Sequence, residues 1–258
     1  MNDGKDMAAR LLQAERSRSA IAPFSDAHRG ISAEAAYAAQ WAFVQAKLDQ
    51  GEKLVGAKLG LTSRAKQEAM GVAEPLYGWV TSGMIASPGE PIDRRTLIHP
   101  RAEPEIAFLL GRDVTAPATV TSVLAATEAV FAAVDILDSR YRDFRFTLPD
   151  VIADNASAGR VVLGPRARRP ADLVDLRLVG CVLRAGGKVV ATAAGAAVMG
   201  HPAAAVAWLI NRLGPQGEGL REGWLVLSGG LTAPVPLEPG QAVTAELDGL
   251  GSVEVHCR

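Results

Sequence analysis

The sequence predicts an α+β protein in which an N-terminal helical layer packs on a curled, mostly antiparallel sheet. Helical periodicity dominates the first 50 residues, and strand-like apolar runs dominate after residue 90. Strands and helices do not alternate strictly, which argues against a doubly wound parallel sheet. We therefore expect an N-terminal helical segment, residues 1–53, packed on a main domain, residues 54–258, that carries the chemistry.

Composition narrows the class of protein. The chain has 258 residues, of which 48% are hydrophobic and 21% charged, so it can bury a sizeable core. The net charge of −1 leaves no basic field for nucleic acid. No apolar run reaches the roughly 20 residues that span a bilayer, and the polar N-terminus resembles no signal peptide. We expect a cytoplasmic protein without membrane or nucleic-acid partners, and reduced, structural Cys181 and Cys257.

The first elements are defined by helix caps and glycines. Helices are predicted over residues 7–19 and 33–50, the second between an N-cap at Ser32 and a stop at Gly51. Residues 54–60 form a short, glycine-interrupted strand, and 64–70 a short helix. The proline and glycine in 74–78 predict a turn or loop.

Strands dominate the remainder of the chain, with a hairpin across Ala185-Gly186-Gly187. Two helices interrupt them, at 119–128 and at 202–213, where Pro202 suits the first helical position. The predicted strands are 104–111, 130–137, 160–164, 174–184, 188–193, 224–230, 241–247 and 252–256.

Two carboxylates begin one of these strands. Residues i and i+2 of a strand point to the same face, so Glu103 and Glu105 project side by side next to an apolar run. Like charges this close repel, and burial makes them costly unless something neutralises them. Magnesium or manganese would do so, since hard cations prefer oxygen ligands. The alternative is a strand edge with two solvated acids.

Two further charged residues lie in apolar segments. Asp135 follows Phe131-Ala132-Ala133-Val134, where an unpartnered acid is rare, so with the two glutamates it makes a set of three carboxylates. The alternative is an Asp satisfied by backbone amides or by Arg140. Lys58 lies between glycines, where it could anchor a substrate carboxylate or move a proton. Alternatively, its stem packs while its amine reaches solvent.

Two polar loops could line a ligand. Residues 154–159 (DNASAG) are small and polar, and such a cluster is either a simple turn or a hydrogen-bonding wall. Gly229-Gly230-Leu231-Thr232 allows close approach of the backbone but lacks the Gly-Lys-Ser/Thr of a phosphate-binding loop. His201 is interpreted as a helix-start residue. No pattern of a covalent hydrolase is present.

Seven motifs in order make the chain resemble a known family, the hydratase/decarboxylase family of meta-cleavage pathways within the fumarylacetoacetate hydrolase-like superfamily. They are GAKLGLTS at 56–63, GVAEPLYG at 71–78, HPRAEPEI at 99–106, DSRY at 138–141, ADNAS at 153–157, MGHP at 199–202 and GLGSV at 249–253. The resemblance implies a mixed β-roll core, a Mg²⁺ or Mn²⁺ cofactor, and 2-oxo or 2-hydroxydienoate substrates. It places Glu103, Glu105 and Asp135 on the three metal-ligand positions.

Two departures from the family pattern matter. The family usually has Glu at the third ligand position, where this chain has the shorter Asp135. Hydratases of the family typically carry an Asp where this chain has Leu76, and the decarboxylases carry an aliphatic residue there. Residues 138–146 and 227–233 also resemble the decarboxylase pattern, whereas 16–26 resemble the hydratases.

The resemblance therefore implies metal-dependent decarboxylation of 2-oxo-3-hexenedioate, a 2-oxo dicarboxylate, to 2-hydroxypenta-2,4-dienoate. Catalytic roles are expected for Lys58, Asn155 and Ser157, and substrate contacts for Leu76, Asp154, Gly230 and Thr232. A homo-oligomer, or a complex with the pathway hydratase, is expected. The alternatives are 2-hydroxypenta-2,4-dienoate hydratase, a C–C hydrolase or oxaloacetate decarboxylase of the superfamily, and a metal-free scaffold.

Overall fold

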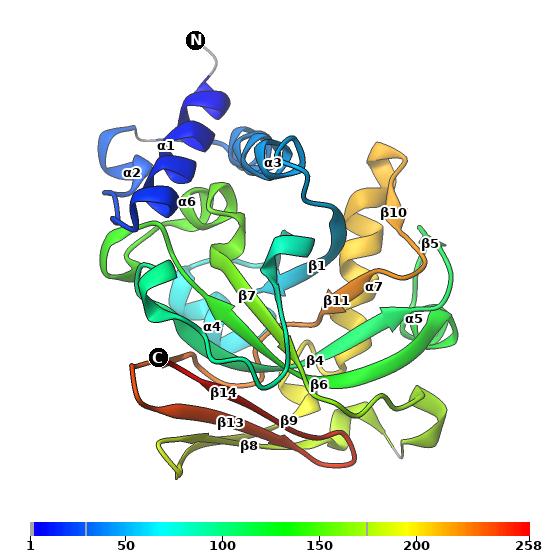
Figure 1. The fold of residues 1–258 in the computed structure, drawn as a ribbon. Coiled ribbons are helices and arrows are strands. Elements are labelled where there is room, and N and C mark those ends of the chain that lie inside the picture. Colours follow the sequence, from blue (N-terminus) through cyan, green and yellow to red (C-terminus); the bar gives the residue numbers. More distant parts are fainter. Residues whose placement is uncertain (1–2, 29, 174) are drawn as a thin grey trace.

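The computed structural model describes residues 3–28, 30–173 and 175–258, arranged as helices above a curled sheet with a second sheet below it (Figure 1). The N-terminal layer contains α1 (Asp3–Ser17), α2 (Phe24–Ala27) and α3 (Ala33–Leu48). Ser32 caps α3 by accepting a hydrogen bond from the Ala35 backbone, as its sequence position predicts. The remaining helices are α4 (Arg64–Met70), α5 (Val120–Ala126), α6 (Leu148–Ala153) and α7 (Pro202–Leu213).

The central sheet has eight strands within the described residues. Its order is β2-β1-β11-β4-β6-β7-β3, with β12 paired to the start of β4. Most pairs are antiparallel, but β1–β11 and β3–β7 are parallel, so the sheet is mixed. Its strands are β1 (Leu54–Gly60), β2 (Leu76–Thr81), β3 (Ile85–Ala86), β4 (Arg101–Leu110), β6 (Thr127–Leu137), β7 (Ala158–Leu163), β11 (Leu225–Leu227) and β12 (Val235–Pro236).

A four-stranded antiparallel sheet of order β14-β13-β8-β9 packs against the strands β6 and β7. Gly186 and Gly187, with φ of 55° and 78°, form the predicted two-residue hairpin turn between β8 and β9. The strands are β8 (Gly180–Ala185), β9 (Lys188–Ala194), β13 (Ala242–Leu247) and β14 (Gly251–His256), and a separate short pair joins β5 (Val114–Thr115) to β10 (Gly219–Leu220).

The two faces of the central sheet differ. One face packs into the large apolar core, which also takes in Leu11 and Phe43 of the N-terminal helices. The other face carries a smaller cluster that includes Ala107, Ala133 and Leu227. Small residues on this second face leave room for polar side chains, and the carboxylates lie there.

Several predicted elements differ from those observed. The segment 74–78 was expected to be a turn, but Leu76 begins β2, because long-range pairing with β1 overrides the local glycine and proline. Strand β8 begins only at Gly180, since residues 176–178 form a 3-10 turn capped by Asp175; residue 174 of that prediction lies outside the described residues. Strand β11 ends at Leu227, earlier than predicted. Helices α2 and α6 were not predicted.

The expectations for His201 and for the two cysteines are confirmed. His201 caps α7, its Nδ1 accepting a hydrogen bond from the Ala203 backbone. Cys181 and Cys257 are buried and free. None of the helices in the described part of the chain has the length and apolar character to cross a membrane. The division at residue 53 stays a prediction.

Candidate metal centre

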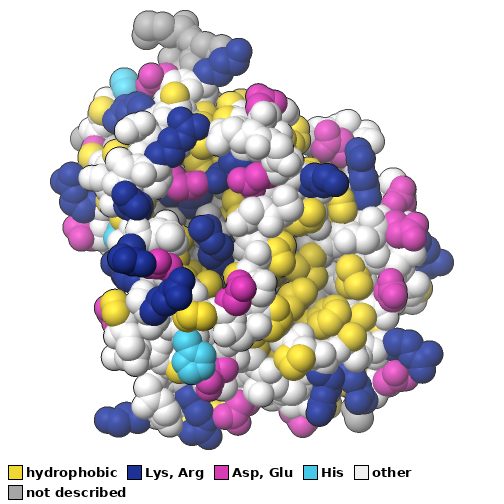
Figure 2. Space-filling model, in the orientation of Figure 1, with side chains coloured by type: hydrophobic (Ala, Val, Ile, Leu, Met, Phe, Trp, Pro, Cys, Tyr) yellow, Lys and Arg dark blue, Asp and Glu magenta, His cyan; other side chains and the backbone are white. Residues whose placement is uncertain are grey.

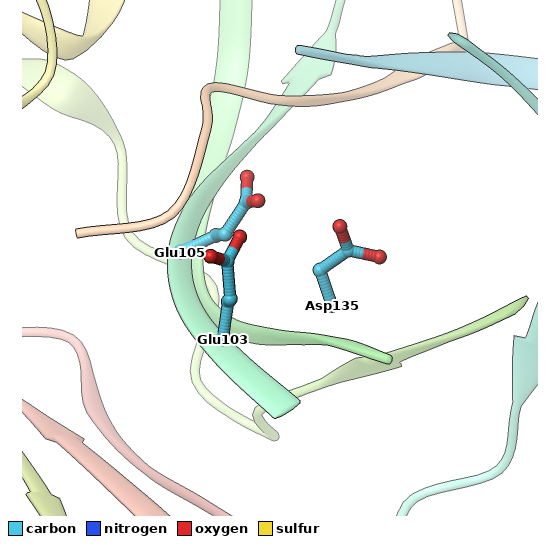
Figure 3. Close-up of side chains that lie close together, drawn as sticks. All are labelled: Glu103, Glu105 and Asp135. Atoms are coloured by element: carbon cyan, nitrogen blue, oxygen red, sulfur yellow. The ribbon is translucent and has the colours of Figure 1, made fainter. Parts of the chain in front are cut away.

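Three carboxylates converge on one face of the central sheet (Figure 3). Glu103 and Glu105 share this face because they are two residues apart on β4. Asp135 joins them because β6 pairs with β4 in a register that puts it directly opposite Glu103. One oxygen from each residue lies within 4.8 Å of one from each of the others, a separation that a single cation could bridge.

The cluster is buried, which excludes the solvated-acid alternative. Glu105 and Asp135 are 0% and 1% exposed, and Glu103 is 7% exposed. Burial raises the pKa of Glu105 well above its usual value, and the charges of Asp135 and Glu103 raise it further. Burial also raises the pKa of Asp135, although Lys58 opposes this. The protein thus disfavours three negative charges here unless a cation accompanies them.

Lys58 supplies part of that compensation. Its Nζ lies 2.5 Å from Asp135 Oδ2 and donates a hydrogen bond to the Ala156 carbonyl at 3.0 Å. The side chain is 2% exposed, so its amine does not reach solvent. The lysine shares the face of the carboxylates because it lies beside Leu227 of β11, which in turn lies opposite Ala107 of β4. The alternative in which the amine of Lys58 reaches solvent is therefore wrong.

The glycine loop after β11 approaches the carboxylates closely. The Gly229 backbone N–H donates to Glu105 Oε2 at 2.7 Å. A Cβ at Gly230 would lie 2.4 Å from Glu103 Oε2, so any larger residue would displace that carboxylate. Thr232 is buried and donates its hydroxyl to the Ala233 carbonyl. The regular strand ends at Leu227, where the Gly229 N–H turns to Glu105, although the Ser228 and Leu231 N–H groups still donate to the β4 backbone.

A second lysine, which the sequence reasoning missed, also reaches the cluster. Lys66 of α4 places Nζ 2.7 Å from Glu103 Oε1. Nothing local distinguishes it from an ordinary solvated lysine on a short helix, because its partner is 37 residues away. Only the folded structure shows the contact.

The predicted ligand wall at 154–157 forms an internally bonded turn. Asn155 accepts from the Trp79 N–H through Oδ1 and donates to the Trp79 carbonyl through Nδ2. Ser157 donates its hydroxyl to Asp154. Asn155, Ala156 and Ser157 all have φ between 52° and 54°, a conformation that points the Ala156 carbonyl at Lys58. The turn therefore positions Lys58; direct contact of these side chains with substrate stays a prediction.

Arg140 does not neutralise Asp135, so that alternative is wrong. The arginine is fully buried and pairs with Asp154 at 3.3 Å and with Glu15 of α1 at 3.1 Å. Burial raises the pKa of Asp154 to about 6 despite this arginine. The network links the N-terminal layer to the turn behind Lys58.

Leu76 occupies the same sheet face as the site. It lies opposite Gly60 on β1, two residues beyond Lys58, and is 2% exposed. An added Cβ at Gly60 would come within 3.0 Å of its side chain, so the glycine makes room for the leucine. Leu76 therefore places an apolar side chain against the end of β1, two residues beyond Lys58.

The donor set fits a hard divalent cation. Glu105 Oε1 and both oxygens of Asp135 are buried without a hydrogen-bond partner among the described residues, although Asp135 contacts Lys58. Unpartnered buried carboxylate oxygens are costly, and magnesium or manganese prefers such ligands. Glu103, Glu105 and Asp135 would hold the cation.

Fold and site together define a family. Residues 50–258 match the model of the fumarylacetoacetate hydrolase C-terminal domain, and the chain belongs to this family. It is 43% identical over 222 residues to 4-oxalocrotonate decarboxylase of Pseudomonas sp. strain CF600, covering 86% of this chain and 84% of that one. It is 40% identical to 2-keto-4-pentenoate hydratase of Burkholderia vietnamiensis, covering 98% and 96%.

A solved structure agrees closely with the fold. The 4-oxalocrotonate decarboxylase of Pseudomonas putida G7, complexed with magnesium and adipate, superposes with a TM-score of 0.95. The two chains are 37% identical, and the match covers 99% of this chain and 97% of that one. The resemblance inferred from sequence motifs is therefore confirmed, as is the α+β fold.

Proposed function

We propose that this protein is a divalent-metal-dependent carboxy-lyase that converts 2-oxo-3-hexenedioate to 2-hydroxypenta-2,4-dienoate and carbon dioxide. The observation that carries the proposal is the buried cluster of Glu103, Glu105 and Asp135 with Lys58 against it. The decarboxylase relatives support the substrate, and the relative crystallised with magnesium and adipate supports both a cation and a six-carbon dicarboxylate.

The chemistry requires an electron sink at the 2-oxo end of the substrate. When the carbon–carbon bond to the distal carboxylate breaks, carbon dioxide leaves. The electron pair of that bond stays on the carbon chain and passes through the conjugated system to the 2-oxo oxygen. One proton on that oxygen completes the product. A magnesium or manganese ion held by the three carboxylates supplies Lewis-acid stabilisation of this developing charge.

The protein's own groups manage the proton and exclude water. Lys58 carries a proton on an ammonium whose position is fixed by Asp135 and by the Ala156 carbonyl. Fixed geometry of this kind is what general acid–base catalysis needs. The buried Leu76 offers no group that activates water, which favours release of the dienoate over its hydration.

Hydration of 2-hydroxypenta-2,4-dienoate is the second candidate function. Hydratases are 40% identical to this chain over 98% of its length, and the same carboxylates would serve both reactions. The apolar Leu76 is the feature that argues against this reaction.

The test is an ultraviolet progress curve with 2-oxo-3-hexenedioate in the presence of magnesium, manganese or a chelator. We expect metal-dependent release of carbon dioxide that stops at the dienoate. Hydration of added dienoate without consumption of the diacid would favour the second candidate. Activity on neither compound would contradict both.

We also propose that the protein assembles into a homo-oligomer, to which the pathway hydratase could bind. On the face in Figure 2, apolar side chains gather around the middle of the molecule, to the right of centre, and are bordered by charged ones. Exposed apolar area of this kind favours an interface. Size-exclusion chromatography with light scattering tests this, because it measures the molar mass of the protein in solution. The cytoplasmic location stays a prediction.

A further inference from the structure

Lys66 lies at the accessible edge of the carboxylate cluster. Its side chain is 24% exposed, whereas that of Lys58 is 2% exposed. Its Nζ is 2.7 Å from Glu103 Oε1 and 3.4 Å from the Gly230 carbonyl oxygen. A group that enters the cluster from solvent therefore meets Lys66 before Lys58.

The backbone of Lys66 is fixed while its side chain can turn. Ser63 caps α4 by accepting a hydrogen bond from the Lys66 N–H. Gln67 donates to the Leu61 carbonyl, and Gly71 ends the helix in the left-handed conformation. The four-carbon stem of a lysine on such a base can move its ammonium between neighbouring acceptors.

Cation binding weakens the attraction between Lys66 and Glu103. The ammonium lies on Glu103 Oε1, a divalent cation on the same carboxylate shares its negative charge, and like charges repel. With all three carboxylates ionised, the acids and the two lysines sum to −1, and a bound divalent cation turns this to +1. The excess positive charge then favours an anionic ligand.

We propose that Lys66 is the anchor for the carboxylate next to the 2-oxo group of the substrate. In the metal-free protein its ammonium is held on Glu103, and entry of the cation transfers it to that carboxylate. Lys58 is less suited to this task, because its side chain is only 2% exposed, against 24% for Lys66, and both Asp135 and the Ala156 carbonyl engage it. The inference rests on the proposed metal-dependent function, and it divides the two lysines into a proton carrier and an anchor.

The test measures binding by calorimetry, with magnesium alone and then with oxalate added to the magnesium-loaded protein. Oxalate has the same chelating edge as a 2-oxo acid and does not react. Lys66→Met should weaken oxalate binding about 10- to 100-fold, the size of a lost charge-assisted hydrogen bond. Magnesium affinity should stay within about threefold of wild type or become tighter, because a competitor for Glu103 has gone.

Arg64→Met is the matched control, since it removes a positive charge from the same helix at a side chain that is 92% exposed. It should leave both affinities unchanged. Lys66→Gln repeats the test with a polar side chain, so that a folding defect of the methionine variant does not decide the result.

A purely structural role would give a different pattern. If Lys66 only holds Glu103 in place, its loss weakens magnesium binding, and that outcome overturns the proposal. Unchanged oxalate affinity also overturns it, as does wild-type protein that binds no magnesium. Because oxalate binding does not depend on carbon dioxide release, failure of the anchor and failure of the decarboxylase assignment are separate results.

Discussion

Replacement of Lys58 by methionine tests the centre of the proposed mechanism. Methionine keeps the length and apolar character of the stem but removes the ammonium that lies 2.5 Å from Asp135 Oδ2. Both side chains are at most 2% exposed, so Asp135 would remain as an uncompensated buried charge. Breaking such a pair costs about 3–5 kcal/mol of unfolding free energy. We expect a loss of this size in the metal-free protein, measured by urea denaturation with a chelator present.

Magnesium should reduce this deficit, because a cation on the three carboxylates compensates Asp135 in place of the lysine. At 100 times its dissociation constant, a ligand adds about 2.7 kcal/mol to the stability of either protein. At the same magnesium concentration the variant should gain more than the wild type, because its more negative cluster should bind the cation more tightly. Urea denaturation with saturating magnesium measures the difference.

Turnover should not recover with stability. Removing a general acid typically lowers the rate about 10²- to 10⁴-fold, and we expect this loss in carbon dioxide release by the magnesium-loaded variant. Lys53→Met, at an exposed lysine just before β1, is the matched control. Turnover of Lys58→Met equal to wild type with metal bound would refute the assigned role, whatever its effect on stability.

Three further predictions concern the site and its surroundings. Gly230→Ala puts a methyl group 2.4 Å from Glu103 Oε2 and should weaken magnesium binding about tenfold or more. Gly180→Ala is the control, because its added Cβ meets nothing within 4 Å, and it should leave magnesium binding unchanged. Titration of the two variants with magnesium makes the comparison. Burial raises the pKa of Glu15, but its cationic partners, Arg140 and Lys47, outweigh burial and lower the pKa below 4.5. The ionised Glu15 therefore stabilises the fold above pH 4.5, and this stabilisation is lost as the pH falls through the folded pKa. Glu15→Gln should therefore lose less stability than wild type in acid denaturation, and an unchanged acid profile would contradict this. Burial and neighbouring carboxylates raise the pKa of Glu105 above 4.5, so in the metal-free protein its contribution to stability declines as the pH rises through the folded pKa. Magnesium should consequently bind with release of protons, seen as a buffer-dependent enthalpy in calorimetry; an enthalpy independent of buffer would disprove it.

The chemistry-bearing residues of the metal centre could be named from the sequence because their evidence is local. Strand periodicity puts Glu103 and Glu105 on one face wherever β4 lies. An acid in an apolar strand, Asp135, and a lysine between glycines, Lys58, are unusual enough to need partners. The ordered motifs added a resemblance to a known family, and that resemblance implies a divalent cation.

The partners of those residues were decided only by the tertiary structure. The sequence left Arg140 as a candidate for Asp135, but folding gives that arginine to Asp154 and Glu15. It left Asn155 as a substrate contact, and folding engages its amide with the backbone of β2, a strand that the local sequence predicted to be a turn.

The sequence by itself thus determined which charged side chains form the candidate metal centre and which face of a strand two of them share. The tertiary structure decided that Asp135 lies opposite Glu103, that Lys66 reaches the same acid, and that the loop at Gly230 closes against it. The physical reason is the range of the interactions. Local periodicity and caps act over a few residues, whereas strand register and ion pairs join segments that are tens of residues apart and form only when the whole sheet has assembled.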